Sequence, residues 1–352
     1  MITNLTVILG AGASVDLIPS HSMNSIRDNN FKPKVTKDLF NTPGIRVLEE
    51  NYLLFPGVEQ HLGRIRKISN SENSAKSLEV YLRKLREAPE EHDRRFFRHF
   101  ALYLQSFFHL VSEGFCYTPV NYTHLLGETQ KEKIRKVFYV TLNYDLFFDK
   151  ALKGYRYDIK SKDIEKYIPS NEKWAYIKLH GSIDWGRPIR ERWIRNAGLN
   201  LSSLLDNIDQ LGDDLEKYLE DIEIDFTYHL PNGRRLLYPA ISVPVDGESK
   251  YNCPPKHVEA LKKHLDQCQN FLVIGYSGID RDLLDLLSKK QGGFNKIQIV
   301  SGSRTEAMKA KKNFLSHRDL RGKLKNHISL YKGNGFSSFI QDGSLEKFIE
   351  SL

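Results

Sequence analysis

Short apolar runs, most of them ending in glycine or a small polar residue, constrain the fold of this chain most strongly. They alternate with segments of helical periodicity, the order expected of an α/β protein with a largely parallel sheet. The helical segments are clearest at Val258–Cys268 and Asp280–Lys289. The pattern predicts strands at Leu5–Leu9, Val137–Thr141, Ala175–Leu179, Leu236–Pro239, Phe271–Gly275 and Lys296–Val300, with Ile328–Tyr331 as a final edge strand.

Two intervals between these runs are too long for a single crossover helix. The first interval lies between the first two predicted strands, and its segment Phe96–Val111 is rich in apolar and aromatic residues. Before that segment, one helix face carries Leu78, Tyr81, Leu82 and Leu85. The second, Arg187–Leu230, has helical stretches rich in Leu and Asp that we expect to pack beside the first. We therefore predict a core of residues 1–44, 131–186 and 231–352, with a mainly helical insertion lobe of residues 45–130 and 187–230.

The composition is that of an ordinary globular protein, with 40% hydrophobic and 27% charged residues among 352. The apolar runs are much shorter than the roughly 20 residues of a membrane-spanning helix. Met1 leads directly into an apolar run without a basic leader, so we expect a cytoplasmic protein that does not contact a membrane. Cys116, Cys253 and Cys268 lack the paired spacing of a disulfide framework or a zinc site, and we expect them to be reduced.

The formal charge of +8 leaves the question of nucleic-acid binding open. A solvated helix face is the simpler interpretation of the basic residues, because no aromatic interleaving or DNA-binding motif accompanies them. An anionic dinucleotide would also favour a basic protein. The basic residues gather at Lys309, Lys311, Lys312, Arg318, Arg321 and Lys323.

The sequence GAGAS, Gly10–Ser14, follows the first predicted strand and precedes a predicted helix. Gly10 and Gly12 would let backbone amides approach a pyrophosphate, and the helix N-terminus would favour its charge. Ser14 would add a hydroxyl donor. The alternative is a tight packing turn between strand and helix, but the position of the motif directly after a strand and before a helix favours a nucleotide site.

The sequence TLNYD, Thr141–Asp145, follows the second predicted strand. Ligands of open α/β sheets bind beyond the carboxyl ends of the strands, so Asn143 is expected to contact a ligand. Its side-chain amide can both donate and accept hydrogen bonds. The alternative makes Asn143 a turn residue. Asp145 is expected to cap the following helix.

The sequence LHGS, Leu179–Ser182, ends the third predicted strand. A histidine at this position can titrate near neutral pH and move protons, and Gly181 would keep the approach to it open. Most histidines are structural, but the position of His180 at a strand end favours a catalytic role. Asp184 and Trp185 are expected to anchor the loop.

Two later turns follow strands in the same way. The sequence GYSGID, Gly275–Asp280, places Gly275 and Ser277 where small residues can line a ribose or a phosphate, and Asp280 is expected to cap the next helix. The turn at Ser301–Ser303 would contact the adenosine end of a dinucleotide.

These four main motifs, in this order and spacing, resemble the sirtuin superfamily, in which GAG, T-x-N-x-D, His-Gly and G-x-S motifs surround NAD. The resemblance implies a sirtuin-like Rossmann fold, mostly parallel and twisted, flanked by helices. Deacylase sirtuins carry T-Q-N-I-D and a zinc module with two C-x-x-C pairs, whereas this chain has TLNYD and no such pairs. The chain looks closer to the sirtuin-like NAD-hydrolysing effectors of bacterial antiphage defence, which lack the zinc module.

The resemblance implies NAD glycohydrolase activity with NAD as the substrate and no metal. Asn143 would orient the nicotinamide ribose or the attacking water, and His180 would act as general base. NAD would be held by Gly10, Ala11, Gly12, Ala13, Ser14, Thr141, Asp145, Gly181, Gly275, Ser277, Ser301 and Gly302.

Three other functions stay open from the sequence: an NAD-dependent protein deacylase, an ADP-ribosyltransferase, and a sensor that binds NAD or ADP-ribose without turnover. The resemblance further implies an effector of abortive infection that depletes NAD and needs an off state. Such a protein is expected to form homo-oligomers or to join a partner that activates it, either an ATPase or helicase or a nucleic-acid-guided sensor.

Overall fold

The fold is described from a computed structural model, over residues 2–17, 55–69, 80–85, 87–88, 90–115, 118–155, 164–190, 201–224, 237–243 and 251–352. Leu78 and Cys116, both named above, lie outside these ranges. Cys253 and Cys268 are free and buried, as expected of reduced structural cysteines.

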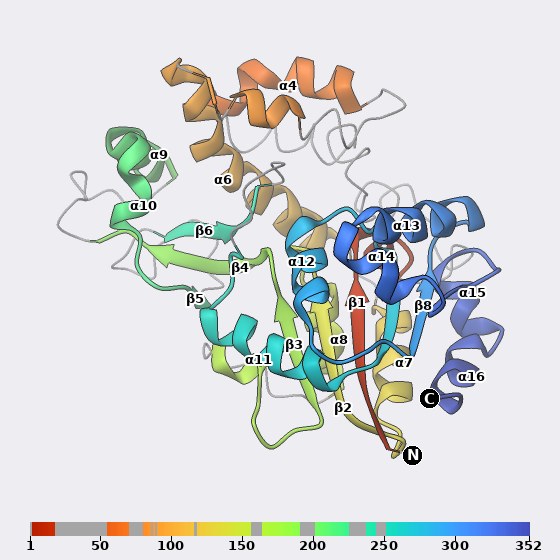
Figure 1. Cartoon of the computed structure of the whole chain (residues 1–352). Helices are drawn as coiled ribbons and strands as arrows, with labels where there is room; N and C mark the ends of the chain where they lie inside the picture. Colours follow the sequence, from red (N-terminus) through yellow and green to blue (C-terminus); the bar gives the residue numbers. More distant parts are fainter. Residues whose placement is uncertain are drawn as a thin grey trace.

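A six-stranded parallel sheet forms the centre of the molecule, with the strand order β3-β2-β1-β7-β8-β9 (Figure 1). This is the order of a dinucleotide-binding Rossmann sheet, in which the strand order reverses between β1 and β7 while all strands stay parallel. The predicted parallel sheet is confirmed, including its last edge strand. Its strands are β1 (Thr3–Leu9), β2 (Ile134–Thr141), β3 (Trp174–Lys178), β7 (Asn270–Ile274), β8 (Lys296–Val300) and β9 (Ile328–Leu330).

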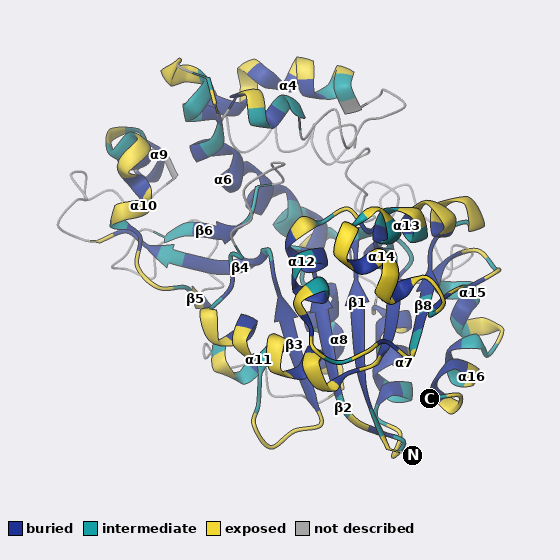
Figure 2. Cartoon of the chain, in the orientation of Figure 1, coloured by how far each residue is buried: buried dark blue, intermediate teal, exposed yellow. Residues whose placement is uncertain are grey.

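Helices cover both faces of this sheet (Figure 1). On one face lie α11 (Pro255–Gln267) and α12 (Arg281–Lys289), which match the two predicted periodic segments, together with α13 (Arg304–Ser316) and α14 (Arg318–Leu324). On the other face α7 (Val120–Thr129) packs on α8 (Phe147–Gly154), α15 (Gly335–Gln341) and α16 (Ser344–Glu350). Because both faces are covered, β7 is buried along its whole length, and Figure 2 shows the central strand β1 as buried over most of its length.

A second, antiparallel sheet adjoins the first, with the order β5-β4-β6. Its strands are β4 (Gly181–Pro188), β5 (Glu223–Ile224) and β6 (Leu237–Ile241). The run Leu236–Pro239, predicted as a strand of the parallel sheet, was therefore placed wrongly, because β6 pairs with β4. Only Leu179 and His180 separate β4 from β3, too short a link for the crossover that another parallel strand needs.

The helical part contains α4 (Pro56–Ser69) and the long helix α6 (Glu91–Gly114), which pack together. Beside them lie α9 (Leu201–Leu211), η5 (Gly212–Asp214) and α10 (Leu215–Tyr218), so the second helical stretch packs on the first as expected. The division into core and lobe stays a prediction. Its boundary at residue 186 falls inside β4, and α7, assigned to the lobe, packs on helices assigned to the core.

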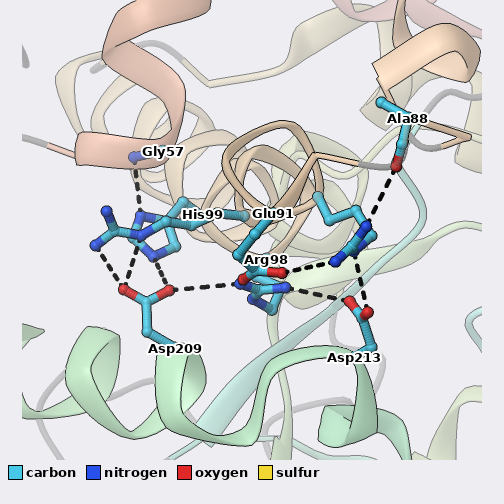
Figure 3. A network of polar contacts seen from close by, with 9 residues as sticks. Gly57, Ala88, Glu91, Arg98, His99, Asp209 and Asp213 are labelled. Atoms are coloured by element: carbon cyan, nitrogen blue, oxygen red, sulfur yellow. Dashed lines mark hydrogen bonds and ion pairs between the residues drawn. The ribbon is translucent and has the colours of Figure 1, made fainter.

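Charged side chains join α6 to α9 and η5 (Figure 3). Asp209 on α9 accepts hydrogen bonds from Arg95 at 2.8 Å and from the buried His99 at 3.0 Å. Asp213 on η5 pairs with Arg94 at 3.0 Å and with Arg98 at 3.4 Å. These contacts fix the helices of this part to one another. Among the helices that the structure describes, none has the length and apolar character needed to cross a membrane.

The remaining elements are short. They are α1 (Ala11–Val15), directly after β1, and the 3-10 turn η3 (Ile164–Tyr167), before β3.

Candidate functional site

The motifs predicted from the sequence meet at one rim of the six-stranded sheet. Strand register places Leu9, Thr141, Lys178, Ile274 and Val300 in one row, so the residues that follow them begin at the same level. Backbone hydrogen bonds then join neighbouring turns: Gly10 N–H donates to Ile274 O, and Leu179 N–H donates to Thr141 O, both at 3.0 Å. The GAGAS turn follows β1, and the GYSGID turn follows the neighbouring strand β7. The strand order of the sheet reverses between these two strands.

The glycines of the GAGAS turn pack directly against Gly275. Gly12 N–H donates to Gly275 O at 3.0 Å, and a Cβ on Gly10 would lie 2.5 Å from that same oxygen. Gly275 has φ +63°, and a Cβ there would overlap the backbone nitrogen of Ala13. The packing of the two turns therefore explains these glycines by itself, whether or not a pyrophosphate also approaches them.

Asn143 lies in a buried network that joins the first two turns. Its Nδ2 donates to Gly10 O and to Ser14 Oγ, both at 3.0 Å, and its backbone N–H donates to Thr141 Oγ1 at 3.0 Å. The Gly10 carbonyl can only accept, so the side-chain nitrogen must face it, which fixes the orientation of the amide. In the described parts of the chain, no group hydrogen-bonds the Asn143 carboxamide oxygen.

Ser14, Tyr122 and Asp145 complete this network. Ser14 Oγ donates to Asp145 Oδ2 at 2.8 Å and lies 3.0 Å from the Tyr122 hydroxyl, which therefore donates to Ser14. Burial raises the pKa of Tyr122 well above its ordinary value, and the nearby Asp145 raises it further, so the phenol stays protonated. Together with Asn143 these residues form what we call the Asn143 group.

Asp145 also supports the start of α8. Its Oδ1 accepts the backbone N–H of Phe147, the first residue of the helix, at 3.1 Å. The expected capping contact therefore exists, although the helix begins one residue later than a standard N-cap at Asp145 would require, with Leu146 at that position. Burial raises the pKa of Asp145, against the opposing effects of the Ser14 hydrogen bond and of the Lys178 charge.

His180 lies at the end of β3, where the second sheet begins. Gly181 has φ +82°, and a Cβ there would overlap the Ala240 carbonyl oxygen of β6, so glycine is required for this turn. The His180 carbonyl accepts the Ser242 N–H at 2.8 Å, and the Tyr144 hydroxyl donates to the Ser242 carbonyl. The Tyr144 and His180 rings lie 6.4 Å apart, which places His180 beside the residue that follows Asn143.

Two carboxylates from the start of α12 face His180. The Nε2 atom of His180 lies 2.9 Å from Asp280 Oδ2, and the two side chains are 19% and 17% exposed. Burial alone would raise the pKa of Asp280, but the hydrogen bond from His180 and its charge hold it below its ordinary value. Burial and the charge of Asp280 raise the pKa of Asp282 to about 6. These three residues are called the His180 group below.

A buried ion pair lies between the two groups. Lys178 Nζ donates to Asp149 Oδ2 at 2.9 Å and to the Asp145 carbonyl at 3.0 Å. The hydroxyls of Tyr167 and Tyr176 donate to Asp149 at 2.9 and 3.2 Å. The charge of Lys178, at the carboxyl end of β3, is thus fully paired and serves to fix the strand that precedes His180.

The other predicted binding residues differ in exposure. Ser277 and Gly302 are exposed at the rim, Ala11, Gly12 and Gly275 are partly buried, and Ser301 is buried with its carbonyl accepting the Gly335 N–H at 2.9 Å. Ala13, Ser14, Thr141 and Asp145 are buried. Asp184 and Trp185, expected to anchor a loop, belong to β4 instead, because the chain begins its second sheet there.

Sequence reasoning missed Asp282 altogether, and it missed three further features of this site. The capping role predicted for Asp280 is confirmed, since Oδ1 accepts the Leu283 N–H at 2.8 Å, but its contact with His180 was not foreseen. Nothing in the sequence marked Tyr122, which comes from a distant helix. Tyr144 lay inside the TLNYD motif and offered the one usable signal, an aromatic residue between Asn143 and Asp145.

Two groups of described side chains have histidine and carboxylate atoms within 4.8 Å of one another, a spacing that a metal ion could use. The first is the His180 group, and the second comprises His124, Glu128 and Glu346. In each, the histidine already pairs with a carboxylate at 2.9 Å. That no metal takes part remains a prediction.

Fold and rim together define an open α/β protein with Rossmann strand order and a polar site at the carboxyl ends of its strands. Residues 137–321, more than half of the chain, match the family described as SIR2-like domain. The chain belongs to this family. A search of curated proteins finds no match.

Among solved structures, a complex of a Sir2 homolog with NAD matches with 12% identity over 99% of this chain and 90% of that chain, at a TM-score of 0.37. A complex of Sir2 with a p53 peptide and NAD+ matches with 15% identity over 99% of this chain and 94% of that chain, at a TM-score of 0.37.

Proposed function

We propose that this protein hydrolyses NAD at the nicotinamide–ribose bond and releases nicotinamide and ADP-ribose. One observation carries the proposal: Asn143 and His180 follow neighbouring strands at one rim, the first with a fixed amide and an unused carboxamide oxygen, the second with a partly exposed imidazole. Membership of the SIR2-like family supports NAD as the substrate.

The dinucleotide would lie across the point where β1 and β7 diverge, as ligands of open α/β sheets do. Exposed Ser277 and Gly302 would contact it directly, together with the backbone of Gly10–Gly12. Ser14 and Asp145 hydrogen-bond each other inside the protein, so they would act by fixing Asn143.

Hydrolysis breaks the bond between the nicotinamide nitrogen and C1 of the ribose, and the bonding electrons leave with nicotinamide, which departs neutral. Positive charge develops on the sugar, and a water oxygen forms the new bond to C1. The Asn143 carboxamide oxygen would accept a hydrogen bond from this water or from a ribose hydroxyl and so orient it. His180 would take the proton from the water and pass it to solvent.

Release of nicotinamide from NAD by the purified protein tests the proposal. A general base contributes about 100- to 10,000-fold to rate, so His180→Ala should lose at least about 100-fold in turnover, and Asn143→Ala should lose a similar amount. His317→Ala is the matched control, because His317 also pairs with an aspartate, Asp285 at 3.1 Å, but does not belong to the His180 group. Full turnover by both site variants would exclude these roles.

The products separate this proposal from its alternatives. Free ADP-ribose from NAD and water means hydrolysis, a requirement for an acyl-lysine peptide means deacylation, and ADP-ribose attached to protein or nucleic acid means transfer. Binding of NAD by calorimetry without any product would indicate a sensor.

For the cellular role we propose a regulated effector of bacterial antiphage defence, in which self-association or a separate activating protein releases the activity. This rests on the resemblance of the motifs alone. The measurement is NAD concentration in cells that express the wild type or His180→Ala, with and without phage. Equal NAD in both strains during infection would contradict the role.

A further inference from the structure

The contact between His180 and Asp280 joins two separate elements, the end of β3 and the start of α12. It uses one particular atom of each side chain: Nε2 of the imidazole lies 2.9 Å from Oδ2 of the carboxylate. Asp282 and Tyr144 are the other described titratable groups beside His180. The geometry of this contact decides which ring nitrogen of His180 remains available.

Asp280 is held in place from several directions. Its Oδ1 accepts the Leu283 N–H at 2.8 Å as the N-cap of α12, and its own backbone N–H donates to the hydroxyl of the buried Tyr276 at 3.0 Å. The two carboxylate oxygens are thereby divided, since Oδ1 serves the helix and Oδ2 serves the histidine. A carboxylate fixed in this way can impose an orientation on the more exposed ring.

The charged carboxylate only accepts hydrogen bonds, so the imidazole nitrogen that faces it must carry the hydrogen. In neutral His180 the proton therefore lies on Nε2, and Nδ1 keeps the free electron pair. The Asp280 carboxylate faces Nε2 and leaves Nδ1 outside this contact.

We propose that Asp280 is a positioning residue that holds His180 in the Nε2–H tautomer and so makes Nδ1 the atom that accepts the proton in NAD hydrolysis. This inference rests on the proposed function for its kinetic consequence but not for its structural part. The low pKa of Asp280 agrees with it, because the carboxylate stays charged beside the ring.

Two substitutions at the same position separate helix capping from control of the tautomer. Asn and Ser both cap helices well, so Asp280→Asn and Asp280→Ser should melt near the wild-type temperature. In Asp280→Asn the amide oxygen caps Leu283, and the NH₂ group is left facing Nε2. Two donors cannot face each other, so the ring should adopt the Nδ1–H tautomer and lose its base. Serine is too short to reach the ring and leaves both tautomers accessible.

We expect Asp280→Asn to lose at least about 100-fold in kcat with little change in KM, because a wrong tautomer removes the base and leaves binding intact. Asp280→Ser should lose less, on the order of 10-fold, because part of its population keeps the working tautomer. Asp285→Asn is the matched control on the same helix, since it alters the analogous pair with His317. Equal losses in the two Asp280 variants, or full activity of Asp280→Asn, would overturn the proposal.

Long-range ¹H–¹⁵N spectra of histidine-labelled protein read the tautomer without any turnover. The signals of His180 are identified by their absence in His180→Gln. Wild type should show the Nε2–H form and Asp280→Asn the Nδ1–H form, and an Nδ1–H form in wild type would overturn the proposal.

Since the spectra need no NAD, a wild type that releases no nicotinamide would refute the proposed function and leave the tautomer assignment to be decided separately. Loss of activity on EDTA treatment, restored by zinc alone, would also overturn the inference, because a cation would then link the two side chains.

Discussion

The two halves of the candidate site are built in opposite ways. The Asn143 group is buried. The Asn143 amide nitrogen donates to the Gly10 carbonyl and to Ser14, and Ser14 donates to Asp145, so the Asn143 carboxamide oxygen takes no part in these bonds. The His180 group is partly exposed and contains two carboxylates. The pKa of Asp280 lies below the ordinary value, and the pKa of Asp282 lies above it. The buried half is suited to orienting a substrate, and the exposed half is suited to moving protons.

The difference predicts that damage to the buried half lowers stability as well as activity, whereas damage to the exposed half lowers activity and leaves stability unchanged or changes it only in a pH-dependent way. Four substitutions test this separation, and a fifth tests charges far from the site.

Lys178→Met should have the largest effect, because it leaves Asp149 buried without its cation. Breaking a buried ion pair costs about 3–5 kcal/mol in unfolding free energy. Urea denaturation measures this loss. The double variant Lys178→Met/Asp149→Asn should regain part of it, and a double variant that loses as much as the sum of the singles would show that the pair is not coupled.

Gly275→Ala should be nearly as damaging, because its Cβ would overlap the backbone of Ala13 at a positive φ. We expect a loss of about 2–4 kcal/mol, since neither backbone can move freely. Gly322→Ala is the matched control in helix α14, where a Cβ meets no atom within 4 Å. It should stabilise the protein by about 0.5–1 kcal/mol. Comparable destabilisation in both variants would refute the steric argument.

Ser14→Ala should cost about 1–3 kcal/mol, because Asp145 and Asn143 each lose a buried partner. Turnover should fall with it, since the Asn143 amide is then less firmly oriented. Ser288→Ala is the control, because Ser288 donates only to the Asp285 carbonyl of its own helix at 2.9 Å. Undiminished stability of Ser14→Ala would mean that the Asn143 group does not support the fold.

Asp282→Asn should change stability in a pH-dependent way. The folded protein raises the pKa of Asp282 from 3.8 to about 6, so folding favours the protonated form. That contribution is fully present below the unfolded value and is lost as the pH rises through about 6. Wild type and Asp282→Asn should thus melt alike at low pH, and the variant should melt higher above pH 6. A difference that is constant with pH would contradict the shift.

Asp213→Ala should have the smallest effect, although its two arginine partners make it prominent in Figure 3. Its side chain is 62% exposed, and such pairs contribute about 0–1 kcal/mol. Thermal melting at low and high salt measures this contribution. Asp209→Ala should cost more because its partner His99 is fully buried. The reverse order would refute the distinction between exposed and buried charges.

Sequence alone determined the strands of the parallel sheet, the clearest of its helices and the turns that carry chemistry, because these are set by local periodicity and by glycine and polar residues at strand ends. It placed Asn143 and His180 at one rim, since parallel strands end on the same side of a sheet. It also marked Asp280 as a helix cap, a role that depends only on the next three residues.

Tertiary structure alone decided what these side chains contact. The pairing of Asp280 with His180 spans 100 positions and depends on how the start of α12 meets the turn after β3, and Tyr122 reaches Ser14 from a helix 108 residues away. Likewise, the short link after β3 kept β4 out of the parallel sheet, and β6 then paired with β4 in a second sheet. Local patterns record which residues end a strand, but hydrogen-bond partners are chosen by the packing of distant segments, which no local pattern contains.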